Sequence, residues 1–312
     1  MSENSHKSVA PENVLRLGTR GSQLALWQSN WVKDRLQEHD VRVELVVIKT
    51  EGDSVPGPLH QIGGQGLFTK AIQTALLRNE IDFAVHSLKD LPTDNIPGLS
   101  IATIPQREDA RDCLVCRPGL NWNTLPDDAS IGTGSIRRQA QLLHLKPGLR
   151  MREIRGNIDT RLKKVAAGEY DASVLAVAGL KRMGWTDRIT HTFPVSAIAP
   201  AVGQGALGIE SRTEDDETRK WLAKINDEGS YFAVMAEREM LRQMQGGCLA
   251  PIGAVSRVDA GILSLSAAVL SNDGKQKIEA QAEGQQTDAE SIGKRVADLL
   301  KSKGAAEVMA IT

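Results

Sequence analysis

A chain of 312 residues is long enough for two or three domains, each with its own hydrophobic core. Hydrophobic residues make up 41% of the chain and charged residues 25%, which is typical of a globular protein. The formal net charge of −1 excludes a global attraction to nucleic acid or to an anionic membrane surface. Any basic site must therefore be a local concentration of charge.

Residues 1–12 are polar and lack the apolar core of a signal peptide. No apolar run approaches the roughly 18–20 residues that span a bilayer. We therefore expect a cytoplasmic protein with no membrane partner, whose three cysteines are reduced thiols.

The first third of the chain alternates strands with helices. Residues 14–18 are predicted to form a strand, and Ser22 is predicted to cap the helix that follows. The apolar face of that helix is predicted to hold Leu24, Trp27, Trp31 and Leu36. Residues 43–48 predict a buried strand, residues 67–79 a helix and residues 81–86 another strand. This alternation indicates a parallel α/β architecture.

The middle of the chain repeats this plan. A short strand at residues 130–132 is predicted to lead into a helix over 136–145, and residues 173–178 predict an apolar strand. A second α/β unit is therefore expected there.

Two pairs of similar segments support a duplicated plan. Residues 18–22 (GTRGS) and 132–135 (GTGS) each end a strand and open a helix, and residues 79–84 and 168–172 each link a helix to an apolar strand. We interpret them as two similar α/β domains that face each other, with ligand-binding loops at the carboxyl ends of their strands. Common turn chemistry remains an alternative explanation for the similarity.

The last third has a different pattern. Residues 262–271 and 277–282 predict two strands joined by a hairpin turn at 272–274, and residues 288–303 predict an amphipathic helix. These elements indicate a small α+β domain that begins near Asp227.

The segment at residues 86–92 (HSLKDLP) follows directly after a predicted strand. Strand ends in parallel sheets are where functional groups gather, and the cation of Lys89 favours the ionised form of Asp90. An ionised carboxylate can stabilise a developing cation or transfer a proton. The alternative for Asp90 is a structural role in a turn or at a helix start.

Several arginines are predicted to lie in turns and at helix starts, which favours anion binding. These residues are Arg20, Arg137, Arg138, Arg155, Arg161 and Arg182. Arg137 and Arg138 follow the second Gly-Thr-Gly-Ser turn, where helix N–H groups already attract anions. The pattern does not separate phosphate from carboxylate ligands, and a solvated helix face remains an alternative.

Cys248 lies in a glycine-rich segment at residues 246–253. A thiol in such a loop can act as a nucleophile or as an attachment point for a group, or it can be an inert small residue. The other two cysteines, Cys113 and Cys116, are predicted to lie on a strand with their side chains on opposite faces, so no metal site is expected there.

Taken together, these motifs resemble the porphobilinogen deaminase (hydroxymethylbilane synthase) family over essentially the whole chain from Asn13 onward. The segments that carry the resemblance, in the order in which they occur, are 13–22, 63–68, 86–92, 132–138, 155–161, 201–206 and 246–248. Each segment alone is weak, but their combination is highly specific.

The resemblance implies two similar periplasmic-binding-protein-like α/β domains plus a small C-terminal α+β domain. The expected divisions are residues 12–105 with 206–224 for the first domain, 106–205 for the second, and 227–312 for the third, which carries Cys248.

The resemblance also implies a transferase of tetrapyrrole (haem) biosynthesis. Its substrate would be porphobilinogen, of which four molecules are joined head to tail, with loss of ammonia at each step, into linear hydroxymethylbilane. The chain would be built on a dipyrromethane cofactor, itself two porphobilinogen units, bound through a thioether to Cys248. A monomer that binds no nucleic acid is expected.

For the site, the resemblance implies that Asp90 is the catalytic carboxylate and that Lys89 acts beside it. Asp90 would assist the departure of ammonia, stabilise the resulting cation and help to remove a proton. The residues expected to bind cofactor and substrate are Arg20, Ser22, Phe68, Lys89, Thr133, Ser135, Arg137, Arg138, Arg155, Arg161, Arg182 and Gln204.

The sequence departs from the family pattern at two positions. Gln65 stands where many relatives have lysine, and Ala71 where they have glutamate. The first departure weakens the case for substrate contacts from residues 60–65, within a predicted loop over 50–66.

Two other functions remain open. A solute-binding module would also use paired α/β lobes around an anion site, although such proteins are normally exported. A different carboxylate-handling transferase would use Cys248 as a transient nucleophile rather than as a permanent anchor.

Overall fold

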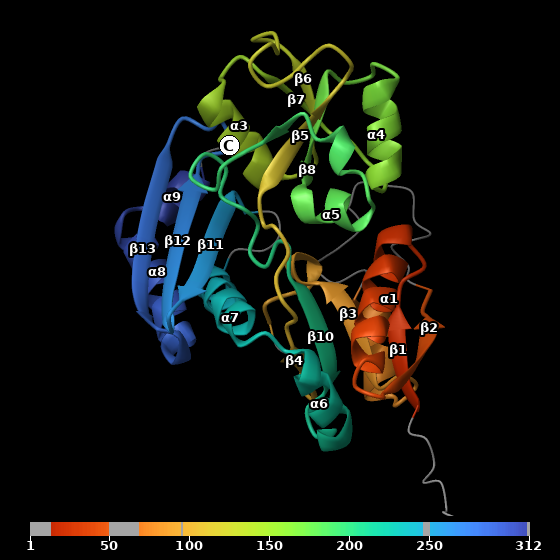
Figure 1. Ribbon diagram of the computed structural model, residues 1–312. Helices are drawn as coiled ribbons and strands as arrows, with labels where there is room; N and C mark the ends of the chain where they lie inside the picture. The colour runs from red at the N-terminus through yellow and green to blue at the C-terminus, as the bar shows by residue number, and fades with distance from the viewer. Residues whose placement is uncertain (1–13, 50–68, 95, 246–249, 311–312) are drawn as a thin grey trace, which may run out of the picture.

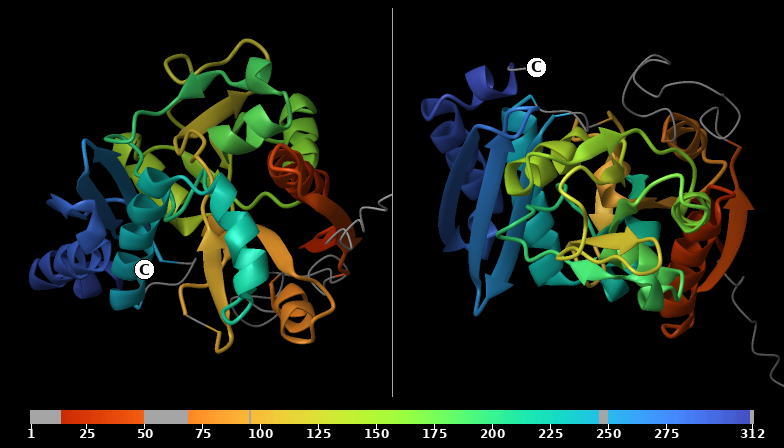
Figure 2. Two further views of the ribbon diagram at one scale, coloured as in Figure 1. Left: turned by 60° about the horizontal axis from the view of Figure 1, so that its bottom comes forward. Right: turned by 90° about the horizontal axis from the view of Figure 1, so that it is seen from above.

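The computed structural model describes residues 14–49, 69–94, 96–245 and 250–310. Within these ranges the chain forms two five-stranded sheets and one three-stranded sheet. In Figure 1 the first sheet lies at the lower right, the second at the top and the three-stranded sheet at the left. Figure 2 shows the three-stranded sheet to one side of both larger sheets from two further directions.

The first sheet has the strand order β2-β1-β3-β10-β4. Its strands and associated helices are β1 (Val14–Thr19), α1 (Gln23–Gln37), β2 (Arg42–Val47), α2 (Lys70–Leu77), β3 (Phe83–Ser87), the 3₁₀ turn η2 (Leu88–Asp90), β4 (Leu99–Thr103), β10 (Leu207–Arg212), α6 (Asp216–Leu222) and the 3₁₀ turn η4 (Ala223–Ile225). Strand β1 is parallel to β2 and β3, whereas β10 is antiparallel to β3 and β4. Apolar side chains of α1 and α6 cover one face of this sheet, and those of α2 cover the other.

The second sheet has the order β7-β6-β8-β5-β9. Its elements are β5 (Asp112–Cys116), β6 (Ser130–Gly132), α3 (Ile136–Leu145), β7 (Arg150–Arg152), α4 (Ile158–Ala166), β8 (Ala172–Ala176), α5 (Val177–Arg182), the 3₁₀ turn η3 (Thr186–Arg188) and β9 (His191–Thr192). Strand β6 is parallel to β7 and β8, and β5 is antiparallel to β8 and β9.

The two sheets therefore share one plan, strand for strand, including the antiparallel fourth strand. In each unit this fourth strand is out of sequence: β10 returns to the first sheet after the second is complete, and β5 enters the second sheet first. Two crossing segments, residues 104–111 and 193–206, consequently connect the units. The expected pair of similar α/β units is confirmed, while the residue boundaries of the domains stay predictions.

The second pair of similar segments has a physical basis at Asp82 and Asp171, which precede β3 and β8. The Asp82 Oδ2 atom accepts a hydrogen bond of 2.7 Å from the backbone N–H of Arg16, at the start of β1. The Asp171 Oδ2 atom accepts one of 2.8 Å from the backbone N–H of Ser130, at the start of β6. In both units this carboxylate aligns the third strand with the first, so the Glu-x-Asp pattern that the two segments share is more than turn chemistry.

The C-terminal unit is a three-stranded antiparallel sheet in the order β11-β12-β13, packed against helices. Its elements are α7 (Glu228–Gln243), β11 (Ile252–Asp259), β12 (Ile262–Leu270), β13 (Lys277–Gln285), the 3₁₀ turn η5 (Gln286–Asp288), α8 (Ala289–Ser302) and α9 (Ala305–Met309). Asp227 caps α7 by accepting a hydrogen bond from the N–H of Ser230, 2.7 Å away. The expected small α+β unit is confirmed, while its boundary near Asp227 stays a prediction.

Three details differ from the sequence predictions. The apolar face predicted for α1 is wrong at Trp27, which is 37% exposed, because Gln28 and Ser29 turn inward and bond to neighbouring strands. Strand β2 is an edge strand, and its Val47 is 54% exposed rather than buried. The predicted strand at 173–178 ends at Ala176, where α5 begins.

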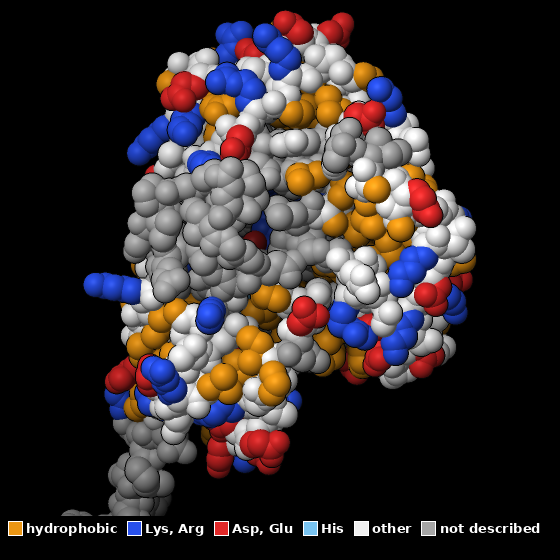
Figure 3. All heavy atoms as spheres, turned by 180° about the vertical axis from the view of Figure 1, so that it is seen from behind, with side chains coloured by type: hydrophobic (Ala, Val, Ile, Leu, Met, Phe, Trp, Pro, Cys, Tyr) orange, Lys and Arg blue, Asp and Glu red, His pale blue; other side chains and the backbone are white. Residues whose placement is uncertain are grey.

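The described part of the face shown in Figure 3 carries Lys and Arg side chains intermingled with Asp and Glu. No helix among the described residues is both long enough and apolar enough to cross a membrane.

Candidate functional site

Lys89 and Asp90 lie in η2, at the carboxyl end of the central strand β3. Asp90 is exposed, whereas Lys89 is partly buried and donates a hydrogen bond to Gln204 Oε1 over 3.4 Å. Burial and the positive charge of Arg138 lower the pKa of Lys89 to about 8, although Asp90 and Asp112 oppose this shift. The lysine therefore sits among other cations at the edge of the sheet where ligands bind in α/β folds.

Asp112, at the start of β5, is the centre of a buried charge network that sequence reasoning missed. Its Oδ2 atom lies 2.7 Å from Arg137 Nη1, and its Oδ1 atom accepts hydrogen bonds from Arg138 Nη2 (2.6 Å) and Nε (3.0 Å). Asp112 is completely buried, which alone would raise its pKa, but the two guanidinium groups hold that pKa far below its ordinary range. A charged residue that opens an apolar strand is the sequence signal that could have revealed it.

The two predicted arginines of α3 are thus held mainly by groups of the protein itself. Arg137 also donates to the carbonyl of Ala199 (2.6 Å), and Arg138 to that of Val174 (3.1 Å). Both side chains are buried. Their binding of substrate or cofactor stays a prediction, and their positions are fixed by Asp112.

Gln204 connects this network to the first unit. Its Nε2 atom donates to Asp112 Oδ1 (2.9 Å) and to the carbonyl of Ala110 (2.7 Å), while its Oε1 atom accepts from Lys89. Gln204 lies in the second crossing segment, so the first and second units share one polar network. In that same segment, the carbonyl of Gly205 accepts a hydrogen bond of 2.6 Å from the buried Arg182.

Arg161 completes the cationic side of the cluster. Its Nε atom donates to the carbonyl of Gly156 over 2.8 Å. Burial and repulsion from Arg138 lower its pKa, and attraction to Asp90 partly offsets them. The structure therefore groups the cations of Lys89, Arg137, Arg138 and Arg161 with the carboxylates of Asp90 and Asp112. This cluster, which we call the charge cluster, has more cations than carboxylates.

Thr133 and Ser135 belong to the turn before α3. The Ser135 Oγ atom accepts from the N–H of Arg138, and the buried Thr133 Oγ1 atom accepts from the N–H of Ser135. Ser22 plays the same capping role for α1, where its Oγ atom accepts from the N–H of Ala25. The predicted cap at Ser22 is confirmed, and the two serines place helix N-termini after the first strand of each unit.

The remaining predicted residues are not joined to the charge cluster by these contacts. Arg20 lies in the turn between β1 and α1 with its Nε atom buried. Arg155 is partly exposed and forms an ion pair of 2.6 Å with Glu153. Phe68 and Cys248, like Gln65 and the predicted loop over 50–66, lie outside the described residues.

The other two cysteines lie on opposite faces of β5, as predicted. Cys113 packs with residues of α5, whereas Cys116 packs with those of β6 and α3. Burial raises the pKa of Cys113 to about 12, so this thiol is a poor nucleophile at neutral pH. Among the described residues, no group of three or more His, Cys, Asp or Glu side chains is placed to hold a metal ion.

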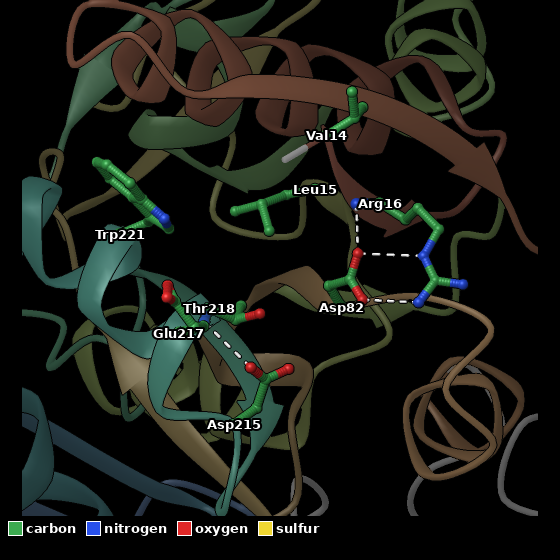
Figure 4. A pocket seen from close by; sticks show the side chains of 8 residues that line it. All are labelled: Val14, Leu15, Arg16, Asp82, Asp215, Glu217, Thr218 and Trp221. Carbon is green, nitrogen blue, oxygen red and sulfur yellow. Dashed lines mark hydrogen bonds and ion pairs between the residues drawn. The ribbon is translucent and has the colours of Figure 1, made fainter. Parts of the chain in front are cut away.

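A separate open pocket of about 510 Å³ lies at the other end of the first sheet (Figure 4). Asp82, which lines it, precedes β3, whereas Asp90 follows that strand. Three of its charged groups have structural partners: Asp82 pairs with Arg16, and Asp215 caps α6 through the N–H of Thr218. This pocket is therefore distinct from the charge cluster.

Comparisons with known proteins agree with the sequence resemblance. Residues 15–220 match the family model described as the dipyromethane cofactor binding domain of porphobilinogen deaminase, and residues 231–302 match the model of its C-terminal domain. The chain is 46% identical to the porphobilinogen deaminases of Geobacter sulfurreducens (96% of this chain, 94% of the relative) and Geobacter metallireducens (97% and 95%). Among solved structures, it is similar to a methionine-binding protein at 11% identity, with a TM-score of 0.44 over 72% of this chain and 94% of the other. The matches to both family models and to these relatives over nearly the full length show that the chain belongs to the porphobilinogen deaminase family.

Proposed function

We propose that this chain is a porphobilinogen deaminase (hydroxymethylbilane synthase), a transferase of tetrapyrrole biosynthesis. It joins four porphobilinogen molecules head to tail, releases one ammonia at each step and yields linear hydroxymethylbilane. The observation that carries the proposal within the structure is the charge cluster at the carboxyl end of β3. It pairs a single exposed carboxylate, Asp90, with an excess of buried and partly buried cations.

The charge cluster fits a substrate rich in carboxylates. Each pyrrole unit carries an acetate and a propionate, and guanidinium and ammonium groups bind carboxylates through charge-assisted hydrogen bonds. Such a bond contributes about 1.5–3 kcal/mol. The pKa of Lys89 is lowered by burial and by Arg138. A carboxylate of the substrate beside this lysine would therefore stabilise its charged form, which burial and Arg138 disfavour.

The same argument applies to the dipyrromethane cofactor, whose two pyrrole units carry acetate and propionate groups. We infer that Lys89, Arg137, Arg138 and Arg161 hold these groups, together with Ser135 and Thr133 at the N-terminus of α3. When bound, the cofactor supplies the terminal pyrrole carbon that is extended. We assign its thioether attachment to Cys248.

Asp90 is the residue we assign to catalysis. Its carboxylate accepts a hydrogen bond from the pyrrole N–H of the incoming porphobilinogen and stabilises the positive charge that develops as ammonia leaves. After the new carbon–carbon bond forms, the same carboxylate assists removal of the proton from the pyrrole ring carbon that formed this bond, which restores the aromaticity of that ring.

Intact-mass measurement under denaturing conditions tests the cofactor assignment. We expect a covalent adduct of two pyrrole units on the wild-type protein, its absence in Cys248→Ala, and its retention in the matched control Cys116→Ala. An unmodified mass in active protein would refute the assignment and favour a transferase with a transient thiol nucleophile. An unmodified mass in inactive protein that binds carboxylates would favour a solute-binding module.

Turnover of Asp90→Asn tests the catalytic assignment. We expect ammonia release and bilane formation to fall by about two orders of magnitude or more, while the covalent adduct remains. Turnover within a few-fold of wild type would give Asp90 a structural role instead.

We further infer a monomeric, cytoplasmic enzyme with the domain divisions 12–105 with 206–224, 106–205, and 227–312. Light scattering in solution checks the oligomeric state, and limited proteolysis checks the divisions, since cleavage is expected at their boundaries.

A further inference from the structure

One face of α7 packs against the turn that carries Asp90. Tyr231, Val234 and Arg238 lie three and four positions apart, so they share this face of the helix. Val234 is completely buried in an apolar cluster with Leu88 and Leu91, and Tyr231 packs at its edge. The two apolar residues that flank Lys89 and Asp90 are thus held by the C-terminal unit.

Arg238 holds the end of the same turn through its backbone. Its Nη1 atom donates to the carbonyl of Leu91 over 3.0 Å, and its Nη2 atom donates to the carbonyl of Pro92 over 2.6 Å. These are the first two carbonyls after Asp90, and the Arg238 side chain is only 7% exposed. Because the guanidinium group is planar and its donors are fixed in a fork, two bonds set the orientation of this segment as well as its position.

The preceding residue, Glu237, fixes α7 to both crossing segments. Its carboxylate accepts from Arg107 Nη1 (2.7 Å) and Nη2 (3.1 Å) in the first segment and from the N–H of Gly203 (2.8 Å) in the second. It also accepts from the N–H (2.9 Å) and Oγ (2.7 Å) of Ser256 in β11. Glu237 is completely buried, so the helix that supports the Asp90 turn is itself firmly held.

We propose that Arg238 is a positioning residue for the catalytic carboxylate of Asp90. It acts by holding the backbone that immediately follows Asp90. Helix α7 also leads in the sequence to the segment with Cys248, so one helix connects the cofactor anchor with the catalytic turn. The inference rests on the proposed function and adds a role for the C-terminal unit beyond carrying the cysteine.

Two substitutions at Arg238 test this role, and Arg242→Gln serves as the control. Arg242 lies one helical turn further along α7, is exposed and pairs with Glu239 over 2.8 Å. We expect Arg238→Gln to lower kcat about tenfold to a hundredfold, because displacing a reacting group by about 1 Å can cost that much. The KM should stay within about threefold and the covalent adduct should be retained. The kcat of Arg238→Lys should be intermediate, since an ammonium group lacks the planar, fixed donors with which the guanidinium group binds both carbonyls. Arg242→Gln should behave like wild type.

A double-mutant cycle separates positioning from general stabilisation of the fold. In an Asp90→Glu background, where the carboxylate already stands at a different distance from the backbone, we expect Arg238→Gln to lower kcat by less than about threefold. A loss as large as in the wild-type background would overturn the proposal, as would an unchanged kcat in Arg238→Gln. If Arg238→Gln does not fold, the same cycle with Arg238→Lys decides the question by the same criteria.

The wild-type mass distinguishes failure of this inference from failure of the proposed function. A wild-type protein without the pyrrole adduct would refute the proposed cofactor chemistry. A wild-type protein that carries the adduct and depends on Asp90, but whose kcat does not respond to Arg238, would refute the positioning role alone.

Discussion

Removing the charge of Asp112 is the sharpest test of the charge cluster. Asp112→Asn keeps the size of the side chain but leaves Arg137 and Arg138 buried without a counter-ion. The present contacts are an ion pair of 2.7 Å to Arg137 and one of 2.6 Å to Arg138, in a residue that is completely buried. Breaking a buried pair by removing one partner costs about 3–5 kcal/mol, because an uncompensated charge remains inside the protein. We expect the free energy of unfolding to fall by about that amount.

Urea-induced unfolding measures this loss, with Asp187→Asn as the control. Asp187 also pairs with an arginine, Arg188 at 3.3 Å, but both side chains are largely exposed, and such a pair contributes only about 0–1 kcal/mol. The difference between wild type and Asp112→Asn should also depend on pH. Because the pKa of Asp112 is lowered in the folded protein, its contribution is present in full above about pH 4 and is lost as the pH falls below that value. Equal losses in the two variants at pH 7 would refute the argument.

Two further predictions follow from single residues. Since the pKa of Lys89 is lowered to about 8, the lysine loses its charge as the pH rises from 7 to 9. The KM should therefore rise over this range in wild type but not in Lys89→Arg, because the guanidinium group stays charged. An equal rise in both proteins would contradict the assignment of Lys89 to carboxylate binding. Gly274→Ala should lower the free energy of unfolding by about 1–3 kcal/mol more than Gly261→Ala. Both glycines have a positive φ, 73° and 80° respectively. They differ in space, because a Cβ atom at Gly274 would lie 2.5 Å from the carbonyl oxygen of Ala140 in α3, whereas the position at Gly261 is open. If thermal or urea unfolding showed equal losses of stability in the two variants, α3 would have to move away from the hairpin between β12 and β13 at no measurable cost.

The features that sequence predicted correctly depend on local chemistry. Ser22 caps its helix through an N–H group only three residues away, so the sequence around this serine contains the whole interaction. The two similar units were visible because equivalent turns occur in the same order. The placement of Asp90 follows likewise, since it needs only the end of a strand and the turn after it.

The features that were missed depend on partners distant in the sequence. Arg138 meets Asp112 across 26 positions, and Arg238 meets Leu91 across 147. A buried charge looks like a surface charge until its partner is known, so composition and spacing gave no signal for Glu237 or Arg238. The apolar pattern of α1 also misled, because Gln28 satisfies its amide by bonding to Ser87 and can therefore be buried.

The duplicated plan explains why the site needs both α/β units. After the third strand, the first unit has η2 with the exposed Asp90, whereas the second has α5 with the buried Arg182. Arg182 holds the carbonyl of Gly205 in a crossing segment. The first unit contributes Asp90, the proposed catalytic carboxylate, and the second contributes most of the cations, so neither unit alone has the charge cluster. Because α7 bonds to the Asp90 turn and to both crossing segments, the C-terminal unit maintains the arrangement on which the cluster depends.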